Sequence, residues 1–276
     1  MNDKSRQITV VVLSILQIFT NTLGGIGILL PTNVGNISDS FSNFFTPAGI
    51  TFSVWTPIYI GLTLYAIYQA LPGQRTRAIH RRIGWIAASA AAANALWTPI
   101  FVLAGEYGTA SFQPFFVYLS LAVMVWLLVS LITIFVRLRN MPADEVTTTD
   151  QFLVKVPFFG YFAWINVATV ANVTLTLITL GWQGTPETGP IWSTVAIAAA
   201  VLITSGVILY SRGGWGTAAY LAVLIWAFAG VYLGNSDQSM LVGVVAIVAA
   251  VALIIAAGFR FTNRPPSTQG AVPTAA

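Results

Sequence analysis

A series of long, almost uncharged apolar windows is the feature of this 276-residue sequence that most constrains its fold. A hydrocarbon core about 30 Å thick needs roughly 20 apolar residues of helix, at a rise of about 1.5 Å per residue. The runs are continuous and much longer than the alternating strands, about 10 residues each, of a membrane barrel. We therefore predict an all-α integral membrane protein with about eight transmembrane helices. The windows cover roughly residues 8–31, 50–71, 83–103, 114–136, 156–181, 191–210, 216–234 and 239–259.

Composition excludes several classes of protein. The chain is 57% hydrophobic and 7% charged, whereas an ordinary soluble domain is roughly 45–50% apolar and about 25% charged. So few charges could not cover the surface of a water-soluble globule of this size. The sequence has no Cys, which excludes disulfides, thiolate metal sites, Cys nucleophiles and iron–sulfur clusters.

The positions of the basic residues predict the orientation in the membrane. Lys and Arg collect in cytoplasmic loops, and with the N-terminus inside, all 12 cations of this chain fall on that side. We expect both termini to be cytoplasmic, in the membrane of a prokaryotic cell. The net charge of +4 then reports orientation and predicts no binding of nucleic acid, and the single His, His80, is expected to be solvated among the inner arginines. The cations are Lys4, Arg6, Arg75, Arg77, Arg81, Arg82, Arg137, Arg139, Lys155, Arg212, Arg260 and Arg264.

The interiors of the eight windows contain no Asp, Glu, Lys, Arg or His. Ion-coupled carriers and conventional hydrolases need titratable groups at depth, so this pattern argues against both classes. The interior polar groups are amides and hydroxyls, which must find hydrogen-bond partners in hydrocarbon, either on another helix or on a ligand. The notable amides are Gln17, Asn21, Asn94, Asn166 and Asn172.

Aromatic residues lie deep in several windows. Phe52, Trp55 and Tyr59 recur at spacings of three and four, so they share one helix face, and Trp97 lies one turn from Asn94. Such walls suit a flat apolar ligand held by stacking and a few amide contacts. Aromatic packing between helices would give the same pattern, so both interpretations stay open at this point.

Four helices together resemble the TspO/MBR tryptophan-rich sensory proteins, a family that includes the mitochondrial translocator protein. The second window begins with a Pro-containing segment and continues as Trp-Thr-x-x-Tyr from Trp55, and the third reads NALWTPIF from Asn94. The fourth carries Val-Trp-Leu-Leu around Trp126. The fifth has Tyr-x-x-Trp-x3-Ala-x3-Asn spacing, in Tyr161, Trp164, Ala168 and Asn172.

The resemblance covers about residues 8–182 and implies a TspO-like five-helix bundle over residues 1–182. Three additional helices would follow over 183–259, with a packing or partner role, and then a disordered cytoplasmic tail over 260–276. By resemblance, the ligand pocket lies between helices one, two, three and five. Its expected ligand-binding residues are Phe52, Trp55, Tyr59, Asn94, Trp97, Trp164, Ala168 and Asn172.

The family binds porphyrins, so the resemblance implies protoporphyrin IX or haem as ligand, with no required cofactor and no metal site. A tetrapyrrole would be held by stacking rather than by axial ligation, because there is no Cys and no deep His. We predict a membrane-embedded ligand-binding or sensory protein. The alternatives are an uncoupled transporter or exporter of small hydrophobic molecules, and light-dependent porphyrin degradation with Trp55 and Trp164 as the catalytic residues.

Two further expectations concern the loop over the pocket and association. The family's first outer loop carries a Trp- and Pro-rich run that covers the pocket, whereas residues 32–49 keep only Phe41, Phe44, Phe45 and Pro47. Small residues recur every four positions along one face of the third window, and such stripes let helices approach closely. It allows either packing within the chain or a homodimer through helix three, and its members are Ala87, Ala91 and Ala95.

Overall fold

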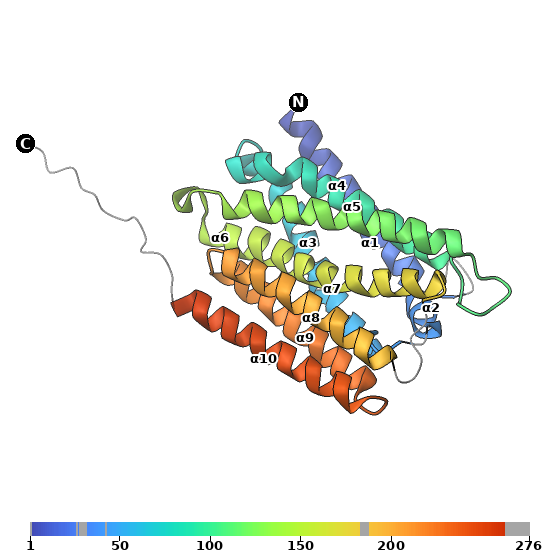
Figure 1. Ribbon diagram of the computed structural model, residues 1–276. Coiled ribbons are helices and arrows are strands. Elements are labelled where there is room, and N and C mark those ends of the chain that lie inside the picture. The colour runs from blue at the N-terminus through green and yellow to red at the C-terminus, as the bar shows by residue number, and fades with distance from the viewer. Residues whose placement is uncertain (1, 26, 28–31, 42, 183–187, 263–276) are drawn as a thin grey trace, which may run out of the picture.

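The computed structural model describes residues 2–25, 27, 32–41, 43–182 and 188–262. This part of the chain is helical without strands, and eight of its helices are long and apolar enough to cross a membrane, as predicted. The membrane-spanning helices (Figure 1) are α1 (Asp3–Gly25), α3 (Trp55–Ala70) with the preceding 3-10 helix η1 (Gly49–Val54), α4 (Ala78–Val102), α5 (Pro114–Arg139), α7 (Val156–Thr179), α8 (Gly189–Tyr210), α9 (Trp215–Asn235) and α10 (Met240–Thr262).

Short elements connect or extend these spans. The α2 helix (Val34–Ser40) lies between α1 and η1, and η2 (Pro72–Gln74) joins α3 to α4. Three elements precede α7: η3 (Ala143–Glu145), α6 (Thr148–Asp150) and the π-helical turn η4 (Gln151–Lys155). The fifth span therefore begins at residue 148, well before the predicted 156. The helix α10 continues to Thr262, so residues 260–262 are helical and do not belong to the predicted tail. Residues 263–276 lie outside the described residues.

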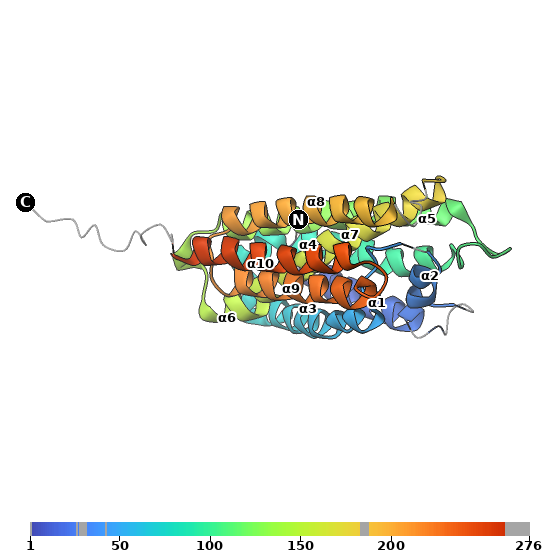
Figure 2. The same ribbon diagram turned by 60° about the horizontal axis from the view of Figure 1, so that its bottom comes forward.

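The spans form two groups on either side of α7. Figure 1 shows α4 and α5 on one side of α7 and α8, α9 and α10 on the other, and the turned view in Figure 2 shows the helices running alongside one another. On the first side α1 packs on α4, α4 on α5, and α5 on α7. On the second side α9 packs on α7, while α8 and α10 pack on each other and α10 on α9.

The middle of α7 is enclosed by protein. Every residue from Pro157 to Val167 is buried, which is about three turns of helix without one exposed face. A helix that is apolar all round is typical of a position inside a bundle. The sequence PFFGYFAWINV meets that requirement, with Gly160 and Ala163 as its small members.

Buried amides link neighbouring helices, which confirms one of the two roles expected for them. Asn21 on α1 donates to Oδ1 of Asn94 on α4 at 2.7 Å. Asn166 on α7 donates to the hydroxyl of Tyr220 on α9 at 3.1 Å. In hydrocarbon a polar group must be satisfied by protein, so each bond selects one arrangement of two helices.

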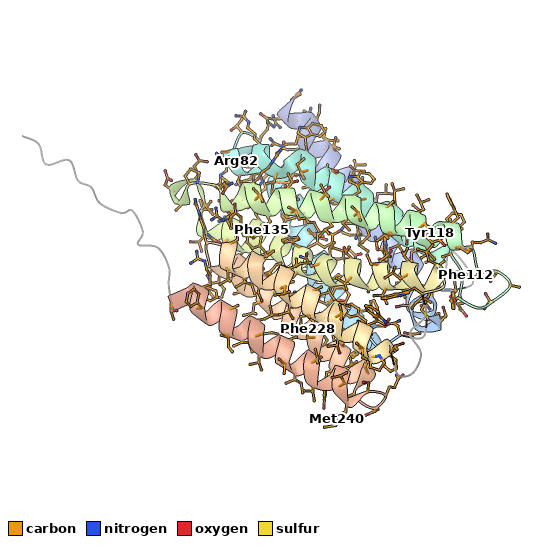
Figure 3. All side chains as sticks on the ribbon, viewed as in Figure 1. Arg82, Phe112, Tyr118, Phe135, Phe228 and Met240 are labelled. Atoms are coloured by element: carbon orange, nitrogen blue, oxygen red, sulfur yellow. The ribbon has the colours of Figure 1, made fainter. Side chains whose placement is uncertain are left out.

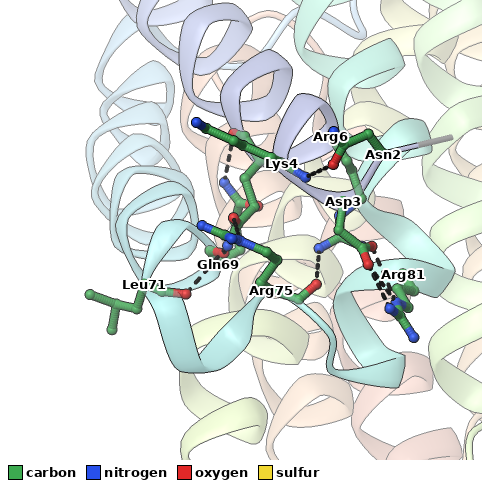
Figure 4. A network of polar contacts seen from close by, with 9 residues as sticks. Asn2, Asp3, Lys4, Arg6, Gln69, Leu71, Arg75 and Arg81 are labelled. Carbon is green, nitrogen blue, oxygen red and sulfur yellow. Dashed lines mark hydrogen bonds and ion pairs between the residues drawn. The ribbon is translucent and has the colours of Figure 1, made fainter.

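The ends of α1, α3 and α4 that carry the basic residues are joined by the polar network in Figure 4. Arg6 donates to the carbonyl oxygen of Arg75 at 2.7 Å, and Arg81 forms an ion pair with Asp3 at 2.5 Å. Gln7, beside Arg6 on α1, donates to the backbone carbonyl at position 69 at 2.6 Å. The start of α1 is thereby fixed against the connection between α3 and α4.

Further arginines join the remaining segments at this end of the bundle. Arg139 donates to the carbonyl of Tyr210 at 2.6 Å, and Arg77 forms an ion pair with the buried Asp150 at 2.5 Å. Hydrogen bonding to that carboxylate raises the pKa of the Arg77 guanidinium, which therefore stays charged. Figure 3 shows Arg82 near this end and Phe112 and Met240 near the opposite end. The described basic residues thus gather at one end, as the sequence predicts.

The expectation of a solvated His80 is wrong. Its side chain is 0% exposed, its Nε2 lies 3.1 Å from Oε1 of Gln74, and its ring packs edge-on against Tyr68 with centroids 5.3 Å apart. The cause is that α4 begins at Ala78 rather than at 83, which places His80 in the first turn of the helix and under the end of α3.

The small residues of the third span are used within the chain. Ala87, Ala91 and Ala95 are buried, and α4 is covered by α1 and α5. Gly24 of α1 lies so close to Thr98 of α4 that an added Cβ would overlap it. This stripe is therefore not a free surface for a homodimer, and dimerisation through helix three stays a prediction without support from it.

Two glycines of α9 allow an equally close approach to the segment that leads into α3. A Cβ added at Gly230 would overlap the side chain of Thr51, and one added at Gly234 would lie 2.8 Å from the backbone nitrogen of Ala48. Small residues at helix interfaces let backbones come together where lipid supplies no hydrophobic driving force. The last three helices are therefore joined to the first five by a backbone-level contact.

We predict that Gly230→Ala destabilises the protein while Gly206→Ala does not. The new methyl group at position 230 would overpack the contact with Thr51, at a cost of about 1–3 kcal/mol. A Cβ at Gly206 on α8 meets no atom within 4 Å, so it serves as the matched control. Thermal unfolding in detergent, followed by circular dichroism, measures both. Equal Tm values for the two variants would contradict the close approach.

Candidate functional site

A small cavity lies between four spans, in the halves that are away from the basic end of the bundle. Its volume is about 60 Å³. All of its described lining side chains are uncharged, and most are aromatic or aliphatic. They are Val34, Ser38, Pro47, Phe52, Trp55, Trp97, Phe101, Met124, Trp164, Val167, Ala168, Ala171, Asn172 and Leu175.

Six of the eight residues expected at the ligand site line this cavity, and they come from η1, α3, α4 and α7. The six are Phe52, Trp55, Trp97, Trp164, Ala168 and Asn172. Helical spacing explains the grouping: residues four apart on one face of α7, such as 164, 168 and 172, point the same way. The sequence spacing therefore converges on one place in the structure.

The aromatic rings of the cavity pack mostly edge to face. The Trp164 ring lies 5.9 Å from that of Phe52 and 6.1 Å from that of Trp55, centroid to centroid, with planes near perpendicular. The Trp97 ring is stacked on Phe101 at 5.0 Å. Such pairs contribute about 0.5–1.5 kcal/mol each beyond burial, so these walls have a defined shape.

The other two expected residues, Tyr59 and Asn94, lie one layer deeper. The Tyr59 ring is stacked under Trp55 at 5.0 Å, and its hydroxyl lies 3.4 Å from Oδ1 of Asn94. That same oxygen accepts the bond from Asn21, whose own Oδ1 accepts from Thr98. A polar cluster from α1, α3 and α4 therefore forms the floor beneath the aromatic cavity.

Three polar atoms in or beside this floor are buried with no hydrogen-bond partner among the described residues. They are Nδ2 of Asn94, Nε1 of Trp97 and the hydroxyl of Tyr161. Two of them are obligate donors and the third can donate. A buried donor without a partner costs about 1–3 kcal/mol. The arrangement is thus suited to a ligand or a water molecule that presents an acceptor.

Asn172, by contrast, is already paired across the cavity wall. Its amide and the hydroxyl of Ser120 on α5 lie 3.3–3.4 Å apart, and Ser120 also donates to the carbonyl of Val117 at 2.8 Å. Asn172 therefore both lines the cavity and joins α7 to α5.

The structure corrects which helices surround the site. The cavity is lined by spans two, three, four and five rather than one, two, three and five. Met124 of α5 takes the place expected for α1, and α1 reaches only the polar floor through Asn21. Sequence reasoning also missed Phe101, Ala171 and Leu175, although each lies three, four or seven residues from an expected residue on the same face. Met124 carries no comparable signal.

The outer loop covers the cavity despite lacking the family's Trp- and Pro-rich run. Val34 and Ser38 of α2 and Pro47 line it from above, and α2 is started by Asn33, whose side chain accepts from Asn36 N at 3.0 Å. Phe41 then stacks on Tyr107 with centroids 4.8 Å apart. The cover that the sequence left in doubt is therefore provided by Val34, Ser38 and Pro47.

Two other deep tryptophans fulfil different roles. Trp126 is 41% exposed on α5 and donates to Ser89 of α4 at 2.9 Å. Trp226 of α9 donates to the carbonyl of Thr51 at 2.9 Å. Neither belongs to the cavity, so position within a span did not by itself identify a site residue.

A larger groove, of about 370 Å³, lies on the other face of α7 against α8. Its rim includes the exposed Trp182 and Trp192, whose rings are 4.5 Å apart, and it contains none of the expected site residues. Among the described residues, no group of three or more His, Cys, Asp or Glu side chains is placed to hold a metal ion. The enclosed cavity therefore remains the candidate site.

Comparison with protein families decides the relationship. A family model described as TSPO-like protein matches residues 7–259. The chain belongs to this family. The match extends beyond the expected residues 8–182 and includes α8, α9 and α10, so these helices are part of the family model. Comparison with curated proteins and with solved structures gives no significant match.

For this TSPO-like protein we predict that Asn94→Ala is more destabilising than Asn172→Ala. Loss of the Asn94 amide removes the acceptor of the Tyr59 hydroxyl, at a cost of about 1–3 kcal/mol, while Asn21 keeps its bond to the carbonyl of Gln17. Loss of the Asn172 amide leaves Ser120 with its bond to Val117, so less is lost. Thermal unfolding of both variants in the same detergent measures the difference. A larger loss in Asn172→Ala would refute the assignment of Asn94 to the structural floor.

Proposed function

We propose that this integral membrane protein of the TSPO-like family binds flat, largely apolar ligands of the tetrapyrrole class in the cavity between α3, α4, α5 and α7. The observation that carries the proposal is the convergence of Phe52, Trp55, Trp97 and Trp164 on one enclosed, uncharged cavity above free hydrogen-bond donors. Apolar cavities with a few placed polar groups are typical of small-molecule sites.

The chemistry of the lining narrows the ligand. Aromatic faces and edges favour a flat conjugated ring system, which stacks or packs edge-on against them. The unpartnered Nε1 of Trp97, which lines the cavity, favours a carbonyl or carboxyl oxygen at the ligand's edge. The lining residues include no His or Cys, and Met124 is the one lining residue of a type that can ligate haem iron. The proposal does not depend on iron ligation, so free protoporphyrin suits the site as well as haem.

The size of the cavity adds a requirement. An engineered cavity of about 150 Å³ is large enough to bind benzene, whereas this one measures about 60 Å³. A tetrapyrrole therefore does not fit the cavity as the structure shows it, and binding requires one wall to move. The segment from Pro47 to Phe52 is a wall made of a loop and a 3-10 helix, whose hydrogen-bond geometry is poorer than that of an α-helix, so we expect this wall to move most easily.

We predict that Ala168→Leu weakens binding of protoporphyrin IX at least tenfold, about 1.4 kcal/mol. The larger side chain would occupy the cavity from α7. Ala198→Leu makes the same change on an exposed position of α8 and is expected to bind like the wild type. Titration of the purified full-length protein, followed by quenching of Trp fluorescence, gives the two affinities, with Tm as the check of folding.

Three outcomes separate the proposal from its alternatives. Equal affinities in Ala168→Leu and wild type would place the ligand elsewhere. Absorbing products that form in light and disappear in Trp55→Phe would show porphyrin degradation at the same site. Flux of porphyrin across proteoliposomes that Ala168→Leu leaves unchanged would show transport by another route.

We also propose that the end carrying the basic residues faces the cytoplasm, because Lys and Arg concentrate there by the positive-inside rule. The chain has no Cys, so single cysteines report sidedness without background. In a bacterial host, Gln238→Cys should react with a membrane-impermeant maleimide in intact cells. Gly73→Cys should react only after permeabilisation, since both positions are exposed but lie at opposite ends. The reverse labelling would overturn this orientation.

A further inference from the structure

The movable wall of the cavity is hydrogen-bonded to α9. Three bonds connect the segment 46–51 to this helix: Ala48 N donates to the carbonyl of Gly230 at 2.9 Å, Trp226 Nε1 donates to the carbonyl of Thr51 at 2.9 Å, and Asn235 Nδ2 donates to the carbonyl of Thr46 at 3.0 Å. The same short segment supplies Pro47, and it leads directly to Phe52, both of which line the cavity.

These bonds lie where hydrogen bonding is most effective. Asn235 is 2% exposed and Thr51 is 1% exposed, so a partner in each of these two side-chain bonds is buried, although the Trp226 ring itself is 42% exposed. The absence of a Cβ at Gly230 and Gly234 brings the two backbones together. The walls from α4, α5 and α7 are more constrained, because α4 packs on α5 and α5 packs on α7.

We propose that Trp226 and Asn235 of α9 are positioning residues for the ligand cavity, which hold its 46–52 wall inward and so limit the size and the rate of entry of the ligand. This inference rests on the proposed function, since it names the part of the chain that regulates that same site. It also gives α8, α9 and α10 a role, because movement of the wall on binding is transmitted to α9.

The expected change in ligand affinity follows if the 46–52 wall has two states, a closed one held by α9 and an open one that admits the ligand. If the ligand binds only the open state, its apparent affinity is reduced by the small fraction of protein in that state. Removing one hydrogen bond that exists only in the closed state raises the open fraction. A typical bond changes such an equilibrium by a factor of about two to ten. The ligand should then bind faster and more tightly although the protein itself is less stable.

The test uses Trp226→Phe, which keeps an aromatic ring and removes the donor, with Trp215→Phe at the other end of α9 as the matched control. Stopped-flow mixing of the full-length protein with protoporphyrin IX, followed by porphyrin absorbance, gives the association rate and affinity. We expect both to rise about two- to tenfold in Trp226→Phe and to stay at wild-type values in Trp215→Phe. A variant that merely damaged the fold would bind less well.

A second variant and its control test whether the effect is specific to Trp226. Asn235→Leu removes the bond to Thr46, and Gln238→Leu, on an exposed neighbour, is its control. Hydrogen exchange of residues 46–54 without ligand should be faster in Trp226→Phe and Asn235→Leu than in their controls, Trp215→Phe and Gln238→Leu. Two results would overturn this inference: unchanged exchange of the segment, or faster exchange without faster binding of protoporphyrin IX. If Ala168→Leu still weakens binding in either case, the proposed ligand site remains supported. No saturable binding by the wild type would instead refute the proposed function.

Discussion

The packing of α7 against protein on every side is the interaction on which the rest of the structure depends. In hydrocarbon, helices gain nothing from hiding apolar surface from lipid, so association comes from close packing and from hydrogen bonds. The buried stretch from Pro157 to Val167 supplies the first, and Asn166 and Asn172 supply the second on opposite neighbours, Tyr220 and Ser120. One helix thereby holds α5 on one side and α9 on the other.

That central position also determines where the cavity can lie. Trp164, Ala168 and Asn172 follow one face of α7, and the helices held against that face contribute Trp97 and Met124. The cavity floor is completed by the bond between Asn21 and Asn94, which fixes α1 on α4. The amides that build the bundle and the amide donors that remain free for a ligand therefore belong to the same cluster, and a substitution there affects folding and binding together.

The sequence predicts the spans from local pattern, because span number follows from apolar length. The expected site residues come from the family resemblance, and the structure brings six of the eight to one cavity. Helical spacing accounts only for those on a shared face, such as Trp164, Ala168 and Asn172. Local pattern cannot predict which helices pack against each other. Met124 lines the cavity and His80 is buried because of tertiary packing, which residue spacing does not encode. The cover formed by α2 was missed for the same reason, since its contact with α4 and the stacking of the following Phe41 on Tyr107 are tertiary.

The contact between α9 and the segment leading into α3 shows why three further helices matter to a site they do not line. A 3-10 segment has poorer hydrogen-bond geometry than an α-helix, so η1 by itself is a weak wall for a cavity that must have a defined shape. Bonds from Trp226, Gly230 and Asn235 supply the missing constraint from outside. A wall held by a few identifiable bonds can be released by a ligand whose binding free energy exceeds theirs, whereas a wall of packed α-helix could open only by separating the bundle. Under the proposed function, the bonds from α9 are what allow a small cavity to admit a large ligand.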